Sequence, residues 1–414
     1  MPPAKNLVVA QSGGPSPVIN NTLRGIIETC QGLDAIGTVY GARHGIEGVL
    51  KEELLDLSGQ SSEEISLLRY TPAAGSIGTC RYKLKPDQQE DFDRCLDVFR
   101  AHEVGYFIYI GGNDSMDTAN KIAQLAEQRG LPLVGIGGPK TIDNDVGINC
   151  PAEEALDYTK IINYFCPGFP SAAHLVAKYV RDIRTTAYSH NRVIFVEAMG
   201  RYAGWLTLSA AYGGADLILI PEVTYNPDKM AEVIEKQYRD KGHLIIAVSE
   251  GISDANGDLL TESAELDSFG HARPGGCSEV IADHMKNRIP SLSSSVFRHQ
   301  VLGYMQRCGS PIPIDRDTAI KAGRLAVSAV ENGQVNHVST IMRTGLGLEP
   351  HLLNLDQVLK RGEDGHVIRR DTDSRFYDAE NFSISPAGIG YFRPIFGDIP
   401  RDHMGLGLDK TTIE

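Results

Sequence analysis

The chain has 414 residues, a length that predicts two or three structural units. Its residues are 42% hydrophobic and 22% charged, which is typical of a globular protein. It holds no run of about 18 apolar residues, and its first residues lack the regions of a signal peptide, so we expect no membrane partner and no secretion. The net charge of −13 without a basic block argues against a nucleic acid partner. Seven widely spaced cysteines without a CxxC pair indicate reduced thiols and a cytoplasmic protein.

Three short apolar runs in the first part of the chain each lead into a pair of glycines. The runs cover 6–10, 106–110 and 133–136. Unbroken apolar runs of this length are typical of strands buried on both faces of a parallel sheet. Helical periodicity follows the first two runs, over 19–30 and 116–126, and a glycine at 130 is placed to end the second helix. Strand, glycine turn and helix in this order predict an α/β fold.

The same alternation returns in the second half of the chain. Apolar runs at 193–196, 217–220 and 244–248 surround a helical pattern over 227–239, which predicts a second sheet. The segment 166–170 is interpreted as a connection between the halves. The charged stretch 360–378 and the glycine- and proline-punctuated end predict an irregular tail on the surface.

The glycine pairs lie where a ligand would bind. In open parallel sheets, ligands bind beyond the carboxyl ends of the strands, and bare backbone N–H groups at a helix N-terminus attract anions. We therefore expect a phosphate-bearing ligand near Gly13 and near Gly111-Gly112. Tight strand-to-helix turns would also explain any single pair. Neither a Walker P-loop nor a dinucleotide fingerprint occurs at these turns.

The third glycine pair leads into Pro139-Lys-Thr-Ile-Asp-Asn-Asp145. This stretch places two carboxylates, Asp143 and Asp145, and an ammonium group, Lys140, at a strand end. Charged groups in a sheet crevice cost desolvation unless they are paired or used. Aspartate and asparagine also favour turns, and Asp145 could cap a helix, so this stretch alone leaves its function open.

Together with Gly111-Gly-Asn-Asp-Ser115, this stretch resembles the phosphofructokinase family. The resemblance continues in 197–201 (EAMGR), 249–251 (SEG) and 302–311 (LGYMQRCGSP), with matching order and spacing. It spans about residues 6 to 345. Five co-linear signatures make chance agreement negligible.

The resemblance implies an α/β fold of two doubly wound domains with mainly parallel sheets and a cleft between them. Residues 1–165 with about 308–345 would form the phosphoryl-donor domain. Residues 166–307 would form the fructose 6-phosphate domain, and 346–414 a C-terminal extension packed on the surface.

The resemblance also implies roles for single residues. Asp143 would be the general base that takes the proton from the 1-hydroxyl of fructose 6-phosphate. Arg192 and Arg298 match arginines that family members lend across a subunit interface, so a homodimer or homotetramer with shared active sites is expected. For each arginine, a solvated surface cation is the alternative. The sugar phosphate would be held by Thr141, Ile142, Asp143, Arg192, Met199, Gly200, Arg201, Glu250, Arg298, Tyr304 and Arg307.

The phosphoryl donor is predicted from two departures from ATP-using members, which resemble GGDGS and PGTIDND. Asp114 and Lys140 here replace glycines of those signatures. A carboxylate would occupy the space of a nucleotide α-phosphate, and two unit charges about 4 Å apart cost roughly 4 kcal/mol at an effective dielectric near 20, nearly a thousandfold in affinity. Lys140 would stabilise charge on the transferring phosphoryl group. Inorganic diphosphate is therefore the expected donor, bound by Gly13, Arg81 and Gly112, in a reversible reaction that gives fructose 1,6-bisphosphate and phosphate.

Two alternatives stay open at this point. If Asp114 instead caps the helix near Ser115 and Lys140 points to solvent, an ATP-dependent enzyme of the family is the nearest alternative. The other is a non-catalytic, sugar-phosphate-binding regulatory subunit. The retained Asp143 argues against it, because a pure binder has no use for a base.

Mg²⁺ is the expected cofactor, although its site departs from the family pattern. Asn113 stands where the family usually has aspartate, and its amide oxygen can reach Mg²⁺ directly or through water without contributing charge. Asp145 is the candidate carboxylate. Because Mg²⁺ keeps several waters, diphosphate oxygens could supply much of its coordination shell.

Overall fold

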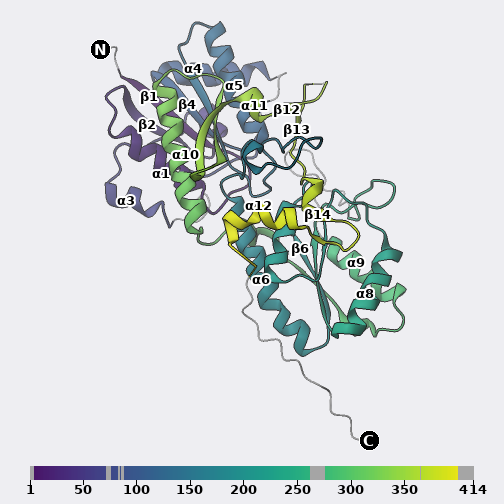
Figure 1. Cartoon of the computed structure of the whole chain (residues 1–414). Helices are drawn as coiled ribbons and strands as arrows, with labels where there is room; N and C mark the ends of the chain where they lie inside the picture. The colour runs from purple at the N-terminus through teal and green to yellow at the C-terminus, as the bar shows by residue number, and fades with distance from the viewer. Residues whose placement is uncertain are drawn as a thin grey trace, which may run out of the picture.

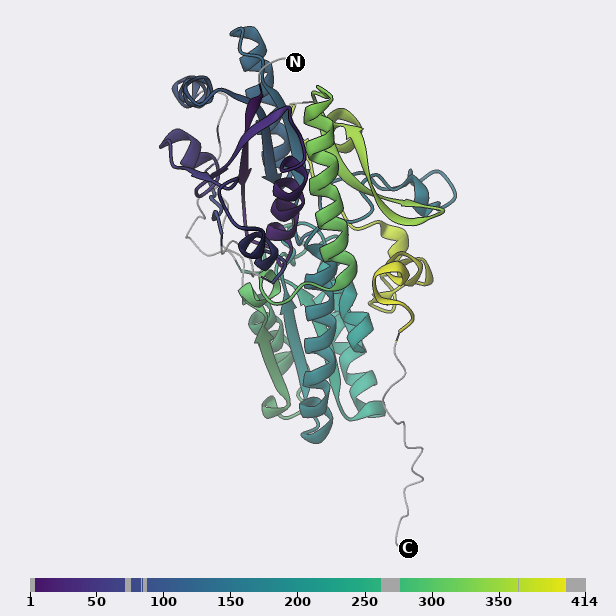
Figure 2. The same ribbon diagram turned by 90° about the vertical axis from the view of Figure 1, so that its left-hand side faces the viewer.

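The computed structural model describes residues 4–70, 76–82, 84, 88–261, 276–363 and 365–399. They form two α/β units that lie one above the other, each with a central sheet between helices (Figure 1). After the second sheet, the chain returns to the first unit through the long helix α10 (Pro313–Glu331), which Figure 2 shows in full length. The predicted α/β fold with two mainly parallel sheets is therefore confirmed.

Seven strands form the first sheet. In spatial order they are β11 (Gly347–Asn354), β10 (His337–Thr344), β5 (Val134–Pro139), β4 (Val104–Gly111), β1 (Lys5–Gln11), β2 (Ile36–Ala42) and β3 (Leu54–Asp56). The two edge pairs, β10–β11 and β2–β3, are antiparallel, and the pairs between them are parallel. The carboxyl ends of β1, β4 and β5 therefore meet at one edge of the sheet, together with the three glycine pairs.

Helices cover both faces of this sheet. They are α1 (Ile19–Cys30), α2 (Ile46–Leu50), α3 (Ser62–Leu67), α4 (Gln89–Ala101), α5 (Asn113–Gln128), α10 and α11 (Leu355–Val358). Successive side chains of a strand point to opposite faces, so β1 places Leu7 and Val9 in one core and Val8 and Ala10 in the other. The first core is closed by α1 and α10, and the second by α4 and α5.

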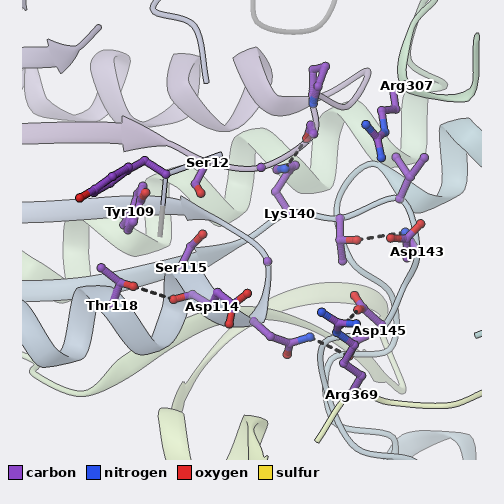
Figure 3. A pocket seen from close by; sticks show the side chains of 18 residues that line it. Ser12, Tyr109, Asp114, Ser115, Thr118, Lys140, Asp143, Asp145, Arg307 and Arg369 are labelled. Atoms are coloured by element: carbon purple, nitrogen blue, oxygen red, sulfur yellow. Dashed lines mark hydrogen bonds and ion pairs between the residues drawn. The ribbon is translucent and has the colours of Figure 1, made fainter. Parts of the chain in front are cut away.

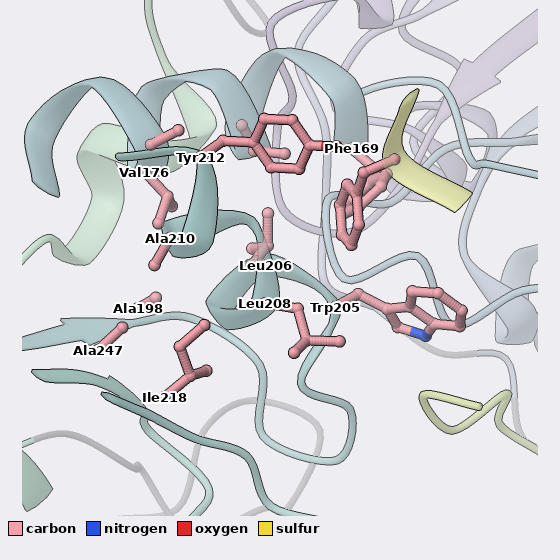
Figure 4. Packing of buried hydrophobic residues seen from close by; sticks show 14 of the residues in the cluster. Phe169, Val176, Ala198, Trp205, Leu206, Leu208, Ala210, Tyr212, Ile218 and Ala247 are labelled. Carbon is pink, nitrogen blue, oxygen red and sulfur yellow. The ribbon is translucent and has the colours of Figure 1, made fainter. Parts of the chain in front are cut away.

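In the described residues, the sheet of the second unit has four strands, all parallel: β7 (Leu217–Leu219), β8 (Leu244–Ser249), β6 (Val193–Ala198) and β9 (Phe297–Val301). Its helices are α6 (Phe169–Ser189), α7 (Trp205–Leu208), α8 (Pro227–Lys241) and α9 (Cys277–Arg288). Ile194 and Val196 belong to the core on the α6 side, and Val193 and Phe195 to the core of α8 and α9. Figure 4 shows the first of these cores, with Trp205 at one end.

The apolar runs of the sequence correspond closely to the strands. Those predicted at 6–10, 106–110, 193–196 and 244–248 lie inside β1, β4, β6 and β8, and the other two overlap β5 and β7. The helix predicted over 19–30 is α1, the one over 227–239 lies in α8, and α5 contains the third. Gly130, with φ +67°, follows the end of α5 as expected.

The connection predicted at 166–170 leads directly into α6. Gly168 has φ +109°, a conformation that favours glycine. Its N–H donates to a carboxylate oxygen of Asp315 at 2.9 Å, and the same fully buried carboxylate accepts from the N–H and hydroxyl of Ser171 at 3.0 and 2.6 Å. Asp315 lies at the start of α10, so this contact ties the outgoing and returning connections together.

The expected surface-packed extension from 346 does not hold for the residues that the structure describes. β11 is an edge strand of the first sheet, and Phe376, Tyr391 and Phe392 are fully buried. Helix α12 (Pro386–Phe396), capped by the Ser385 hydroxyl, lies at the junction of the units in Figure 1.

This packing could not be predicted from the sequence, because charged residues separate the aromatic ones at irregular spacing, without a period of two or 3.6. The remaining short strands are β12 (Lys360–Arg361), β13 (Val367–Ile368), β14 (Tyr377–Asp378) and β15 (Ser383–Ile384). The end of the predicted tail, residues 400–414, lies outside the described residues. None of the described helices has the length and apolar character needed to cross a bilayer.

Candidate active site

A polar pocket of about 160 Å³ opens at the carboxyl ends of β1, β4 and β5, where the sequence predicts a ligand (Figure 3). Pockets for drug-sized molecules usually measure roughly 300–1,000 Å³. The described residues that line it are Ser12, Gly13, Gly14, Pro15, Tyr82, Tyr109, Gly112, Asn113, Asp114, Ser115, Thr118, Lys140, Thr141, Ile142, Asp143, Asp145, Arg307 and Arg369. Its size and polarity suit a small charged ligand.

Lys140 lies on the side of the pocket formed by the Gly13-Gly14 turn. Its side chain is buried, and its Nζ donates to the backbone oxygen of Gly14 at 2.5 Å. Burial lowers the pKa of Lys140 to about 7, and the charges of Arg307 and Arg81 add to this effect. An anion in the pocket would restore the protonated form. The alternative in which Lys140 points to solvent is wrong.

The Gly13-Gly14 turn leaves room for these cations. Gly13 has φ +76°, and a Cβ there would lie 3.5 Å from the Nζ of Lys140. A Cβ on Gly14 would lie only 2.7 Å from the guanidinium carbon of Arg307. The bare backbone therefore lets both cations approach the end of β1.

Helix α5 begins at the pocket, with Gly112 as its N-cap and Asn113 as its first residue. A Cβ on Gly112 would meet nothing within 4 Å, so this side is open to a ligand. Asp114 therefore lies in the first turn of α5 and lines the pocket, and the alternative in which it caps the helix is wrong. The helix N-terminus attracts an anion, while the Asp114 carboxylate repels one that extends too far.

The turn after β5 carries the other two carboxylates of the pocket, Asp143 and Asp145. The N–H of Asp143 donates to the hydroxyl of Thr141 at 3.0 Å, and Asn144 adopts φ +59°, which asparagine tolerates. Burial and the charge of Asp143 raise the pKa of Asp145, and Arg369 opposes this shift. No helix begins within the next twelve residues, so Asp145 is not a helix cap.

The C-terminal segment holds this turn in place. The Asn144 amide donates to the Tyr391 hydroxyl at 2.9 Å, and the buried Arg370 donates through Nε and Nη2 to the backbone oxygen of Asn144 at 3.0 and 2.6 Å. Arg370 also donates to the backbone oxygen of Asn163 at 2.6 Å. Satisfied buried networks of this kind are rigid, so the turn is preorganised.

The loops at the carboxyl ends of the second sheet carry residues predicted to hold the sugar. The N–H of Gly200 donates to Glu250 at 3.3 Å, and the N–H of Met199 donates to Gln306 at 3.0 Å. Burial raises the pKa of Glu250 to about 7, and the charge of Asp143 adds to this rise. Glu250 and Asp143 therefore interact electrostatically across the two units.

Arg307 ends the 3₁₀ turn η4 (Gly303–Arg307) and reaches the pocket from the second unit. Its guanidinium carbon lies 5.7 Å from the ring centroid of Tyr304, a side chain that is 66% exposed. The guanidinium carbon of Arg201 lies 5.8 Å from the ring centroid of Tyr202. Neither Tyr304 nor Arg201 lines the pocket.

Three other arginines with predicted roles also lie outside the pocket lining. Arg192 precedes β6, and Arg298 pairs with Ile194 near the amino end of that strand. The sugar loop at 199–200 follows the opposite end, about 20 Å away at roughly 3.3 Å per residue. The structure does not bring Arg192 and Arg298 to the pocket of their own chain. The charge of Arg81 nevertheless acts on Lys140.

A magnesium ion would find few protein ligands in this pocket. Among the described residues, no group of three histidine, cysteine, aspartate or glutamate side chains could hold a metal. The Asn113 amide nitrogen donates to the backbone oxygen of Asp145 at 3.2 Å, so only its Oδ1 could face a cation. Mg²⁺ suits such a site because it keeps several waters and binds substrate phosphates.

Several residues of the pocket lie outside the motifs that the sequence singles out. Tyr109 and Ser12 line it, and Arg369 reaches it from the C-terminal segment, beyond all the signatures. Only the basic pair Arg369-Arg370 directly after the apolar Val367-Ile368 hinted at a functional position.

The family model for phosphofructokinase matches residues 6–331. The chain belongs to the phosphofructokinase family. Among curated relatives, the pyrophosphate–fructose 6-phosphate 1-phosphotransferase of Xanthomonas campestris is 40% identical over 98% of this chain and 95% of the relative. The enzyme of the same name from Methylococcus capsulatus is 37% identical over 95% and 91%.

Solved structures of the phosphofructokinase family show the same fold. The pyrophosphate-dependent phosphofructokinase of Nitrosospira multiformis has a TM-score of 0.81 and 28% identity, over 98% of this chain and 95% of that one. The one from Marinobacter aquaeolei has a TM-score of 0.79 and 30% identity, with the same coverage.

Proposed function

We propose that this phosphofructokinase uses diphosphate and transfers its phosphoryl group reversibly to the 1-hydroxyl of fructose 6-phosphate. The observation that carries the donor assignment is the joint presence of Asp114 and buried Lys140 in one small pocket. The names of the relatives support it. Phosphate and fructose 1,6-bisphosphate are the products.

The chemistry follows from the walls of the pocket. Asp143 accepts the proton of the sugar hydroxyl as its oxygen attacks the terminal phosphorus. Lys140 would lie beside the transferring phosphoryl group, where negative charge grows on its oxygens, and the N-terminus of α5 would face the leaving phosphate. Preorganised positive charge is the main contribution that a protein makes to phosphoryl transfer.

Magnesium is the proposed cofactor, held by diphosphate oxygens and water with Asp145 and the Oδ1 of Asn113 as the protein's contribution. When bound, it would neutralise charge on the phosphates. Because Arg369 also faces Asp145, the carboxylate is shared between two cations.

The remaining assignments concern the sugar and the assembly. Met199, Gly200, Arg201, Glu250, Tyr304 and Arg307 would bind fructose 6-phosphate from the second domain. Arg192 and Arg298 would serve the site of another copy, which makes the enzyme a symmetric oligomer. All seven cysteines are free, which fits action in the cytoplasm.

A donor-swap assay tests this proposal. With fructose 6-phosphate and Mg²⁺, the purified chain should turn over with diphosphate and not with ATP alone. Asp114→Gly should improve ATP binding by up to about a thousandfold, since it removes the opposing charge. Robust turnover of the native chain with ATP alone would reject the donor assignment, and sugar binding without turnover on either donor would favour a regulatory subunit.

A further inference from the structure

Among the described residues that line the pocket, Arg369 is the cation that comes from beyond the family signatures. It follows β13 and enters the pocket on the side that carries Asp114 and Asp145, opposite Lys140 and Arg307 (Figure 3). Without Arg369, a diphosphate bound between these two sides would meet no cationic side chain of the described lining residues on the Asp114 side. The charge balance of the pocket therefore depends on this residue.

The backbone around Arg369 is fixed. The N–H of the next residue, Arg370, donates to the backbone oxygen of Asp145 at 2.9 Å, and the Arg370 guanidinium is buried against the turn after β5. Two residues further on, the N–H of Thr372 donates to Glu222 at 2.7 Å, and Glu222 also accepts from the N–H of Gly204. Arg369 is thus held between the two units.

The Arg369 side chain has capacity to bind an anion. Its Nε lies 3.7 Å from an oxygen of Asp145, an ion pair too long for a hydrogen bond. Its guanidinium carbon lies 4.3 Å from the ring centroid of Tyr202, next to the sugar loop. The Arg369 side chain also hydrogen-bonds to the Tyr202 side chain. Because the planar guanidinium carries five N–H donors, it can still donate two of them to a phosphate.

We propose that Arg369 is a diphosphate-binding residue, which offsets Asp114 and Asp145 so that the pocket excludes nucleotides and still binds an anionic donor. This inference rests on the proposed function, since it takes diphosphate as the donor. It assigns part of the donor site to the C-terminal segment, which the family model does not cover.

The test measures binding of methylenediphosphonate, a diphosphate analogue that cannot transfer its phosphoryl group, by calorimetry with Mg²⁺ present. Arg369→Gln should weaken binding of the analogue about 10- to 100-fold, which is the loss expected when one or two charge-assisted hydrogen bonds are removed. Arg369→Lys keeps the positive charge but not the paired N–H donors of the guanidinium, so it should give an intermediate loss of affinity. The affinity for fructose 6-phosphate should change less than about twofold in both variants.

Arg361→Gln is the matched control. Arg361 lies eight residues earlier, donates to Asp117 at 2.7 Å, and does not line the pocket, so analogue binding should stay at the wild-type level. Unchanged binding by Arg369→Gln, or an equal loss for the analogue and the sugar phosphate, would overturn the proposal while leaving the diphosphate reaction intact. If the wild-type chain binds no analogue, the donor assignment fails as well.

Discussion

The donor side and the sugar side of the active site differ in how completely one chain builds them. The donor pocket draws on three strand ends of one sheet, the first turn of α5 and a C-terminal segment, and Lys140 is buried within it. On the sugar side, Glu250 and Gly200 are joined, but Tyr304 is 66% exposed and Arg192 and Arg298 lie at the far end of their sheet.

The two sides should therefore respond differently to substitutions and to subunit assembly. Groups fixed by buried hydrogen bonds need no reorganisation, so the donor side should act as a rigid electrostatic template. If Arg192 and Arg298 serve the site of another copy, as proposed, the affinity of the sugar side should depend on assembly. Substitutions on the two sides should therefore affect different kinetic parameters.

The largest effect is expected at Asp143, which lies between the two sides. Asp143→Ser removes the base while leaving both walls in place, so kcat should fall by about 10²- to 10⁴-fold. Binding of fructose 6-phosphate, measured by calorimetry, should survive within a few-fold. Near-normal turnover would contradict the role of Asp143 as base.

The next effect concerns the rigid donor side. Lys140→Met should lower kcat by about 10²- to 10³-fold, as loss of a transition-state donor does in other enzymes, and leave the KM for fructose 6-phosphate nearly unchanged. A lysine is charged below its pKa, and burial lowers that of Lys140 to about 7. In the native enzyme, kcat/KM for diphosphate should therefore decline as the pH rises through about 7.

Lys140→Arg is the control for titration of the donor itself. Its guanidinium stays charged, so the decline above about pH 7 should disappear even if the maximal rate is lower. An identical pH profile in native enzyme and variant would show that the decline does not come from Lys140. Because a bound diphosphate stabilises the ammonium form, the corresponding decline in kcat should begin at higher pH.

The sequence predicted the donor side well except for what the C-terminal segment adds. Apolar runs ending in glycine pairs located β1, β4 and β5, and their parallel pairing brings Gly13, Gly112 and Lys140 together. These are local signals, since each residue lies within a few positions of its strand. Arg369 reaches the pocket through a long-range contact with the turn at 145, for which local periodicity carries no signal.

The buried aromatic residues of the C-terminal segment were missed for the same reason. Phe376 and Tyr391 lie in the second unit's core, where Phe376 packs against Trp205 and Tyr391 against Tyr164, both distant in sequence. Tertiary contacts override local propensity in such segments. The sugar side was predicted through family signatures, and its residues stay predictions.

The smallest effect, and the most specific to the sugar side, is expected at Arg298. Arg298→Gln should raise the KM for fructose 6-phosphate about tenfold and leave the KM for diphosphate unchanged, because its charge would reach only the sugar phosphate of another copy. Arg288→Gln, at a surface arginine paired with Asp228 at 2.8 Å, should change neither value.

Mixing two defective variants distinguishes a lent arginine from a local one. In a homodimer, a hybrid of Asp143→Ser and Arg298→Gln chains contains one site with the base of the second chain and the arginine of the first. Equal mixing with exchange makes half of the dimers hybrids, so about a quarter of all sites should regain native turnover at low fructose 6-phosphate. If Arg298 instead served its own chain, no hybrid site would combine both groups, and the mixture would show only the average of its two inputs.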